Sequence, residues 1–551
     1  MIYINIPTRC FNNIICNMKD CVIVGKFFHR NSLVTHRNGI SLFVKECDSL
    51  NKLNNRLLEL NGFFSLAYQI GNKLFAAVDR IRSYPLFYAQ KGGDFFLSDD
   101  ARWVRDKVGD AKRDGVSETE FLLTGYVTGK DTLYPNLKQI QAGECICYDD
   151  KKKEMNFVRY YQYLHKEPYN LGQDELLELF DQILLKIFDR LLTFLNGRTA
   201  VIPLSGGYDS RLIATMLKRL NYENVITYTY GKPRNKEAVV SELVAKHLGY
   251  KWIFIPYDNE KWNHWYKSKE RIAYYEYSDG LSSLPHIQDW PAVWELKKKE
   301  LIPTDSVFIP GLSADLLTGS LSRHFPKQYR NHTVDLADVI SSVKIYHYVL
   351  HKWERLCPQD CEKVKEKLNK HFEKFKLNQT YPWASLFEQW DCNERHSKFI
   401  NNSIRIYEFW DYDWYLPFWD NDFFDFWSKI DLDEKYNQKL YITYVNTLFK
   451  KITNHEITNH SDNILARQKK HLTAHLKMYA EKYRIIQRLV DCLRFYRDIN
   501  IYDKHFMSRY GVVNKNLFKK IYPESASINS IMALLYLSDD NLQENMKNYL
   551  N

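Results

Sequence analysis

Short runs of β-branched and aromatic residues, separated by turn residues, fill the first 150 positions of the chain. Runs of this length and composition are typical of strands, and the Gly, Asn and Asp residues between them are typical of tight turns. The segments 68–75 and 88–96 each join two runs through a short turn and predict hairpins. The predicted strands are 21–28, 63–70, 73–80, 85–90, 94–99 and 143–149. The pattern therefore predicts an antiparallel β-rich domain with few helices.

The hydrophobic period changes after a polar stretch near residues 160–175. Apolar residues at helical spacing over 175–195 predict a long amphipathic helix. Strands and helices then alternate, which predicts βα units and a parallel sheet. The expected strands are 200–205, 224–231, 251–257 and 306–311, and the expected helices between them are 211–220 and 236–249, the latter ending at Gly249. We predict two domains, 1–165 and 175–551, the second α/β with a helical C-terminal region.

Composition and charge narrow the class of protein. The formal net charge of +10 is spread along 551 residues, which favours a basic solvated surface over a nucleic-acid site. Ten cysteines form no zinc-like spacing, so reduced thiols and a cytoplasmic location are expected. The sequence holds no uncharged apolar run of about 18 residues, and its start lacks the features of a signal peptide. We therefore expect no membrane span.

The stretch "VIPLSGGYDS", residues 201–210, has the features of a phosphate-binding loop between a strand and a helix. Two glycines let backbone N–H groups approach an anion, and the helix N-terminus favours negative charge there. No Walker A lysine follows, and S-G-G-x-D-S is the loop of the ATP pyrophosphatases. The predicted pyrophosphate ligands are Ser205, Gly206, Gly207 and Ser210. A plain Ser-Gly-Gly turn is the alternative.

A second aspartate is expected at the same edge of the sheet. "FIPGLSADLLTGS" follows the strand 306–311 and carries Asp315 between Gly311 and Gly319. Ligands bind at the carboxyl ends of parallel strands, so Asp209 and Asp315 are expected to share one Mg²⁺, unless Asp315 is only a helix cap. The residues expected to line the adenosine part of the ATP site are Leu204, Tyr230, Pro310 and Gly311.

These motifs resemble the asparagine synthetase family. "PLSGGYDS", "GLSADLLTG" and "YLPFWDNDFFDFW" occur in the family's order, and "LNGFFSLAYQ" with the following "FAAVDRIRSYPLFYAQ" is similar to its glutaminase half. The resemblance implies an Ntn-hydrolase-like domain followed by an adenine-nucleotide α-hydrolase-like domain. It also implies that ATP and Mg²⁺ adenylate a carboxylate, releasing pyrophosphate, and that ammonia or an amine then displaces AMP.

The chain departs from the family pattern at two places. Position 2 is Ile2 where the glutaminase uses a cysteine, so we expect the glutaminase-like domain to be inactive. The family reads "SGEGADE" where this chain has "PGLSADL", so Leu312 and Leu316 replace two glutamates. The identity of the carboxylate, which could be a small molecule or linked to a sugar, and of the amine therefore stays open.

Several cationic side chains are candidates for the chemistry. "ARQKKHL" resembles the family's "RQKE" segment and nominates Lys469 to stabilise charge on the phosphates, with Lys470 as second choice; a basic helix face is the alternative. Helical spacing puts Arg395, Lys398 and Arg405 on related faces that could bind an acidic substrate, although a solvated or salt-bridged helix is favoured. Arg323 and His324 are expected near the crevice.

Two other functions compete with an amide-forming ligase. An RNA-modifying enzyme could use the same loop, and a decayed synthetase could serve as a non-catalytic scaffold. The aromatic stretch 407–427 is interpreted as core rather than as a stacking platform. A homodimer is possible.

Overall fold

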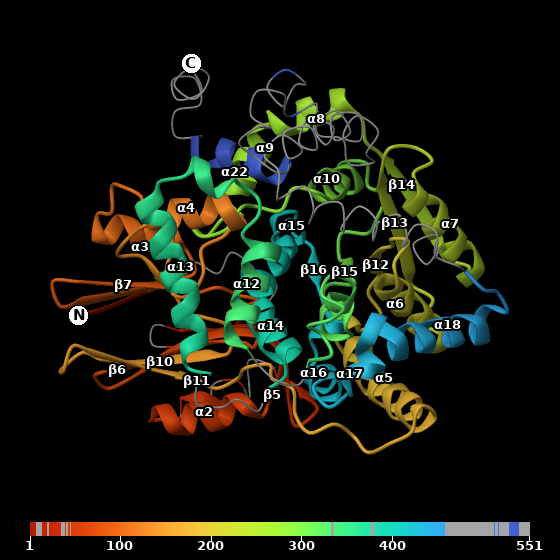
Figure 1. Ribbon diagram of the computed structural model, residues 1–551, viewed down its shortest axis with the longest axis horizontal. Coiled ribbons are helices and arrows are strands. Elements are labelled where there is room, and N and C mark those ends of the chain that lie inside the picture. The colour runs from red at the N-terminus through yellow and green to blue at the C-terminus, as the bar shows by residue number, and fades with distance from the viewer. Residues whose placement is uncertain are drawn as a thin grey trace.

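The computed structural model describes residues 1–6, 14–18, 21–34, 39, 42–44, 46–331, 335–375, 381–457, 512, 516 and 528–538. Figure 1 shows the strands of the first 160 residues on one side and the parallel sheet on the other. The Lys469 and Lys470 predictions lie outside the described residues.

Seven described strands of the first 160 residues form a sheet in the order β11-β10-β6-β5-β3-β2, with β4 paired to β3. Every pairing in this sheet is antiparallel. The predicted hairpin at 68–75 is confirmed, because Ile70 pairs with Lys73. The strands are β2 (Ile14–Met18), β3 (Cys21–His29), β4 (Ser32–Leu33), β5 (Leu60–Ile70), β6 (Lys73–Val78), β10 (Glu144–Asp149) and β11 (Glu154–Arg159).

A second sheet of four described strands has the order β1-β8-β7-β9. The predicted hairpin at 88–96 is confirmed between β7 and β8. The prediction of a purely antiparallel region is wrong at β1, which pairs in parallel with β8. The strands are β1 (Ile2–Asn5), β7 (Phe87–Lys91), β8 (Asp94–Ser98) and β9 (Lys138–Gln139), and the helices of this region are α2 (Leu50–Leu58), α3 (Ala101–Val108) and α4 (Gly115–Thr124).

The later part of the chain holds a parallel sheet of five described strands in the order β14-β13-β12-β15-β16. The chain runs outward from β12 to β14 and then returns to the other side of β12 as β15. The strand order thus reverses between β12 and β15, which is where open α/β sheets bind ligands. The strands are β12 (Ala200–Pro203), β13 (Val225–Gly231), β14 (Lys251–Pro256), β15 (Val307–Phe308) and β16 (Asp413–Trp414).

The predicted helices around this sheet are confirmed. The long amphipathic helix is α5 (Gln173–Leu195), and α6 (Tyr208–Arg219) and α7 (Lys236–Leu248) follow β12 and β13. Gly249 ends α7 in the left-handed conformation, with φ 74°. Figure 1 shows α6 and α7 beside β12 to β14, with α18 next to α6.

The remaining described helices lie mainly after β14. The α-helices are α8 (Asn259–Tyr266), α9 (Lys269–Ser278), α10 (Trp290–Lys298), α11 (Ala314–Leu317), α12 (Leu336–His347), α13 (Pro358–Glu373), α14 (Trp383–Asp391), α15 (Arg405–Phe409), α16 (Asn421–Trp427), α17 (Leu432–Lys435), α18 (Lys439–Thr453) and α22 (Ile528–Ser538). A π-helix, η4 (Cys392–Ile400), continues α14. Short 3₁₀ turns are η2 (Ser320–Arg323), η3 (Trp353–Arg355), η5 (Asn401–Ile404), η6 (Pro417–Trp419) and η7 (Tyr436–Gln438). Among the described helices, none is long and apolar enough to cross a membrane.

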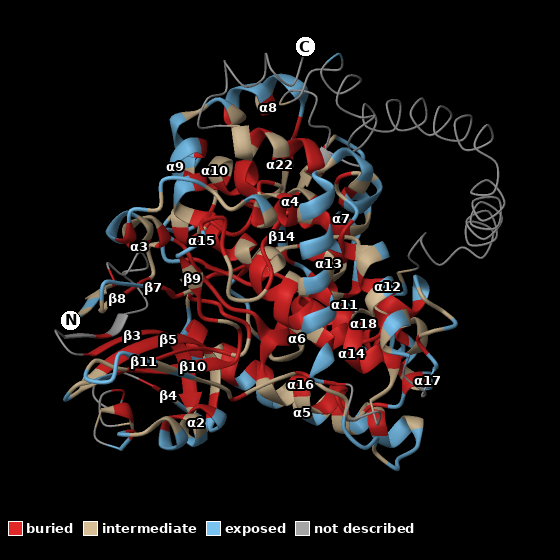
Figure 2. Ribbon diagram, turned by 60° about the vertical axis from the view of Figure 1, so that its left-hand side comes forward, coloured by how far each residue is buried: buried red, intermediate tan, exposed pale blue. Residues whose placement is uncertain are grey.

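One hydrophobic cluster runs from the N-terminal sheets into the parallel sheet. Figure 2 shows β3, β5 and β10 buried over most of their length. The aromatic stretch 407–427 is part of this cluster, and Trp414 packs edge-on against Phe63 at 5.1 Å. The interpretation of the stretch as core is therefore confirmed for most of its rings.

Buried charges also join the two parts of the chain. Lys26 of β3 forms an ion pair with Asp413 of β16, and its Nζ lies 3.9 Å from the centre of the Trp414 ring. Arg198 pairs with the other oxygen of Asp413 at 3.1 Å. Burial opposes ionisation of Asp413, but Lys26 and Arg198 outweigh burial and lower its pKa. The interface is therefore specified by charge as well as by apolar packing.

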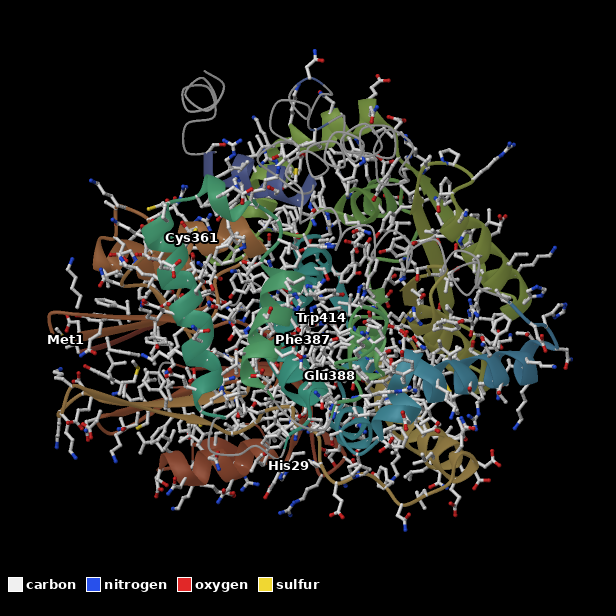
Figure 3. All side chains as sticks on the ribbon, in the orientation of Figure 1. Met1, His29, Cys361, Phe387, Glu388 and Trp414 are labelled. Atoms are coloured by element: carbon white, nitrogen blue, oxygen red, sulfur yellow. The ribbon has the colours of Figure 1, made fainter. Side chains whose placement is uncertain are left out.

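A second buried ion-pair cluster lies on α14. The Nζ of Lys435 donates to Oε2 of Glu388 at 2.8 Å, and the Nε2 atom of His165 lies 2.8 Å from the same oxygen. Both charged side chains are fully buried. Figure 3 places Glu388 in the middle of the molecule, whereas Met1 and His29 lie at its margin.

Candidate active site

A cavity of about 870 Å³ opens where the strand order reverses. Its floor is formed by the segments that follow β12 and β15, because both strands end at this edge of the sheet. The predicted site residues that line it are Ser205, Gly206, Gly207, Asp209, Ser210, Tyr230, Pro310, Gly311 and Asp315. Sequences more than one hundred positions apart are thus brought together by the topology.

The loop after β12 is held in shape by its own serines. The N–H of Ser205 donates to Oγ of Ser210 at 3.1 Å, and the N–H of Gly207 donates to Oγ of Ser205 at 3.2 Å. Gly207 is the N-cap of α6 and has no side chain to accept from the first helical amides. These amides and the positive end of the helix dipole therefore suit an anion in the cavity.

Gly311 explains why the two loops can approach so closely. A Cβ atom at this position would lie 2.7 Å from the backbone N of Ser210 and 2.9 Å from Cβ of Asp209. Both distances are shorter than van der Waals contact, and backbone atoms cannot move aside as the end of a side chain can. Position 311 therefore requires glycine.

Two carboxylates meet beside the glycine loop. The N–H of Asp315 donates to Oδ2 of Asp209 at 3.3 Å, and the hydroxyl of Tyr441 donates to Oδ1 of Asp209 at 2.9 Å. Burial, followed by the charge of Asp315, raises the pKa of Asp209 to about 8. Burial likewise raises the pKa of Asp315. Two buried acids this close repel when ionised.

This pair fits a magnesium ion. Mg²⁺ is bound by one or two carboxylates together with water and phosphate oxygens, rather than by a complete cage of protein ligands. No group of three or more His, Cys, Asp or Glu side chains suited to a metal occurs among the described residues. The repulsion between Asp209 and Asp315 is the kind of charge excess that a divalent cation relieves.

One predicted ATP-binding residue is not at the cavity wall. Leu204 is buried, and its N–H donates to the carbonyl of Tyr228 at 2.8 Å. It continues the sheet behind the loop, so its side chain packs in the core. Lys469 was predicted in a segment outside the described residues.

The cationic residues of the 395–405 segment do not share one face. Arg395 lines the cavity, but Lys398 is fully buried and donates to Glu394 at 2.6 Å and to the carbonyl of Gly129 at 2.7 Å. Arg405 is buried as well, paired with Glu408 at 2.5 Å. The expectation of related helical faces is wrong, because the segment is not one regular α-helix: Arg395 and Lys398 lie on the π-helix η4, and the 3₁₀ turn η5 separates η4 from Arg405 at the start of α15.

The two residues predicted near the crevice also separate. Arg323 lines the cavity. His324 does not; its ring lies 4.9 Å from that of Tyr346. The nearby Leu312, which replaces a glutamate of the family motif, lines the cavity too.

The cavity has further walls that the sequence analysis missed. Most of them lie outside the motifs described above, and only the folded chain brings them to the site. Polar residues among them include Lys236, Glu237, His286, Gln288, Asp289, Ser313, Ser320, His396, Ser403 and Gln438.

The chain is similar to a glutamine phosphoribosylpyrophosphate amidotransferase from B. subtilis complexed with ADP and GMP, with 11% identity over 44% of this chain and 72% of that chain and a TM-score of 0.20. It is similar to an NH3-dependent NAD synthetase from Campylobacter jejuni in complex with nitrate, with 17% identity over 38% of this chain and 97% of that chain and a TM-score of 0.18. It is also similar to a glutamine-dependent NAD+ synthetase from Acinetobacter baumannii in complex with ADP, with 11% identity over 64% of this chain and 90% of that chain and a TM-score of 0.19. These similarities are too low to carry an argument about this chain. No curated protein sequence matches it.

The family comparison is decisive. The sequence profile of asparagine synthase matches residues 198–530, which is more than half of the chain. The match begins two residues before β12, and the glycine loop, both aspartates and the cavity wall on η4 fall within it. The chain therefore belongs to the asparagine synthase family.

Proposed function

We propose that the protein is an ATP-dependent ligase that adenylates a carboxylate, releases pyrophosphate and forms an amide with ammonia or an amine. The observation that carries this proposal is the pair Asp209 and Asp315 beside a glycine loop, at the point where the strand order reverses. Family membership supports the same reaction class.

The glycine loop would hold the pyrophosphate part of ATP. Its backbone amides point to the cavity at the start of α6, and Ser205 and Ser210 supply hydroxyl groups. Donors fixed before the reaction stabilise charge on the phosphates without a cost of reorganisation. Tyr230, Pro310 and Gly311 would line the adenosine part of the site.

Asp209 and Asp315 would hold Mg²⁺. The ion, when bound, would offset the negative charge of the phosphate oxygens. The chain's own contribution is to keep both carboxylates in place, through the Asp315 amide and the Tyr441 hydroxyl. Lys469 is proposed as a further positive charge for the leaving pyrophosphate.

The carboxylate substrate would bind opposite the loop. Arg323 and Arg395 both line the cavity and can pair with an anionic group. Asp391 lies 3.9 Å from Arg395, beyond hydrogen-bond distance, so that the guanidinium keeps donors for a ligand. The substrate class is therefore a carboxylate, free or sugar-linked, that fits between these arginines and the loop.

The nitrogen is proposed to come from free ammonia or an amine rather than from glutamine hydrolysis. A cysteine nucleophile must reach its thiolate form. The described cysteines of the N-terminal sheets are buried, and burial raises the pKa of Cys21 and Cys145 to about 12. Burial also raises the pKa of Cys47 and Cys147 above the ordinary value. These thiols are poor nucleophiles.

Exchange of labelled pyrophosphate into ATP tests the proposal directly. The full chain is assayed with Mg²⁺ and a panel of carboxylates that begins with L-aspartate and extends to other amino acids and uronic acids. Exchange with at least one carboxylate, lost in Asp209→Asn, is expected. Exchange with none of them, together with no binding of ATP, would contradict the proposal and leave a non-catalytic role.

A further inference from the structure

Ser313 has a conformation that serine rarely adopts. It lies at the cavity wall directly before α11, with φ 70° and ψ 3°. This left-handed region favours glycine, and a non-glycine residue held there is often found at a functional site. The Ser313 side chain is buried and lies against η4.

The hydroxyl of Ser313 meets a histidine there. Its Oγ lies 2.6 Å from Nδ1 of His396, and both side chains are buried. His396 comes from a segment 83 positions later in the sequence, and it lines the same cavity. The pair thus stands beside the carboxylates and the glycine loop rather than in a separate part of the protein.

Asp391 faces the other ring nitrogen of His396. Its Oδ1 lies 3.7 Å from Nε2 of His396, and this buried oxygen accepts no hydrogen bond from a described residue. Burial raises the pKa of Asp391 to about 7. In its ionised form, Asp391 favours the tautomer with the proton on the facing nitrogen. Nδ1 is then the acceptor, and the Ser313 hydroxyl donates to it.

The π-helix makes this arrangement possible. Asp391 precedes η4 directly, and His396 follows it by five positions, the interval that one π-helical turn brings together. Burial, followed by the charge of Arg395, lowers the pKa of His396 well below its ordinary value, so the ring is neutral before the reaction and its Nδ1 atom can accept the hydrogen bond of Ser313. His347 of α12 faces the same acid, with its Nε2 atom 3.8 Å from the second oxygen of Asp391.

We propose that Ser313 and His396 form a proton relay that accepts the proton of the attacking amine, with Asp391 as the positioning residue. This inference rests on the proposed function. The amine nitrogen bonds to the acyl carbon of the acyl-adenylate, the bond from that carbon to the phosphate oxygen breaks, and AMP leaves with the electron pair. The nitrogen loses one proton to Oγ of Ser313, whose own proton moves to Nδ1 of His396. The products are the amide, AMP and one proton, which the imidazolium later releases to water.

The relay separates two half-reactions that an assay can distinguish. Adenylation does not involve the amine, so it needs no group to accept the amine's proton. Amide formation does need such a group. In the full chain with ATP, Mg²⁺, L-aspartate or another carboxylate of the panel, and ammonium chloride, pyrophosphate exchange reports the first step and amide formation the second. Ser313→Gly and His396→Asn should slow amide formation by about 100-fold, the usual size of general-base catalysis. Pyrophosphate exchange should fall by a much smaller factor in the same variants.

The glycine variant removes the hydroxyl in a conformation that glycine adopts freely, so misfolding does not explain its defect. Ser342→Ala, at a buried serine that does not line the cavity, is the matched control and should behave as the unmodified protein. Amide formation at the unmodified rate in Ser313→Gly would overturn the relay. Absence of exchange in the unmodified protein with every carboxylate would instead contradict the proposed function.

The tautomer gives a readout that needs no substrate. Nitrogen NMR of the full chain labelled at histidine, with the His396 signal identified by its loss in His396→Asn, should show a proton on Nε2 and none on Nδ1. A proton on Nδ1 would overturn the relay, because Ser313 would then be the acceptor.

Discussion

The backbone amide of Asp315 donates a hydrogen bond of 3.3 Å to Oδ2 of Asp209, across 106 positions of sequence. This bond ties the loop after β15 to the first turn of α6, and so the two carboxylates are held together before any ligand arrives. Preorganisation of this kind lowers the cost of binding a cation and its phosphate partner.

Two substitutions of Asp209 distinguish its negative charge from its hydrogen bond with the amide of Asp315. Asp209→Asn keeps an oxygen that can accept from Asp315 but removes the negative charge, whereas Asp209→Ala removes both. We expect either variant to weaken Mg²⁺-dependent ATP binding by about 10-fold to 100-fold, since a hydrogen bond or contact to a charged group contributes about 1.5–3 kcal/mol. Calorimetric titration with ATP, with and without Mg²⁺, measures this. Equal affinity of Asp209→Asn and the unmodified protein in the presence of Mg²⁺ would refute the metal assignment.

Gly311 should tolerate no side chain. In Gly311→Ala the added methyl group would meet the backbone of Ser210 and push the two loops apart. A displacement of about 1 Å at such a site can cost about 100-fold in activity, and pyrophosphate exchange measures it. Gly172→Ala is the matched control, because a Cβ there lies 3.5 Å from its nearest neighbour and φ is negative. Similar losses in both variants would show that the loop contact is not the cause.

Glutamine should not serve as nitrogen donor. Buried, protonated thiols give no nucleophile, so we expect no release of glutamate from glutamine, while ammonium supports product formation. An enzymatic assay for free glutamate checks this. Cys10 lies outside the described residues, and Cys10→Ala is therefore the informative variant: glutamine hydrolysis that disappears in Cys10→Ala would contradict the proposal.

The buried pair Glu388–Lys435 should dominate local stability. Lys435→Met leaves the Glu388 carboxylate without its main partner, and breaking a buried pair costs about 3–5 kcal/mol in the free energy of unfolding. Lys439→Met is the control, because it removes an ion pair with Glu434 whose N–O distance is similar but whose lysine is exposed. An exposed ion pair contributes at most about 1 kcal/mol to the free energy of unfolding. Urea unfolding of both variants provides the comparison, and equal losses would contradict the expectation.

The same pair predicts a dependence on pH. Burial alone would raise the pKa of Glu388, but Lys435 and His165 outweigh burial and hold the pKa below its ordinary value of 4.5. The stabilisation from this carboxylate is therefore fully present above pH 4.5 and is lost as the pH falls through the lower pKa of the folded state. The difference in unfolding free energy between the unmodified protein and Glu388→Gln should shrink in that acidic range. A difference that stays constant through acid would show that the charge of Glu388 does not contribute.

Lys26 and Asp413 should be energetically coupled. Each single variant, Lys26→Met or Asp413→Asn, leaves one buried charge poorly compensated, whereas the double variant removes both charges of the pair. We expect the double variant to lose about 1–3 kcal/mol less than the sum of the single losses. Urea unfolding of the four proteins gives the coupling, and strict additivity would contradict it.

Periodicity predicted the elements whose neighbours are close in sequence. The hairpins, α5, and the strands β12 to β14 follow from alternation and helical spacing, and the glycine loop follows from residue types that suit few other roles. The two residues of β16 carry no period of their own, so the aromatic stretch gave no sign of a strand. The places of Lys398 and Arg405 differ from the prediction because the prediction used a regular α-helix, whereas the chain forms the π-helix η4 and then the 3₁₀ turn η5 before Arg405. His396 and Tyr441 reach the site only through packing of distant segments, which no local pattern records.

The hydrophobic cluster that runs from the N-terminal sheets into the parallel sheet also constrains how this chain can evolve. Deleting the first 165 residues would expose Trp414 and its neighbours and leave Asp413 without Lys26, whatever chemistry the first region performs. Selection for a working nucleotide site therefore preserves residues that never approach a nucleotide. A region of this kind can persist in a lineage as a structural necessity long after any reaction of its own has ceased to matter.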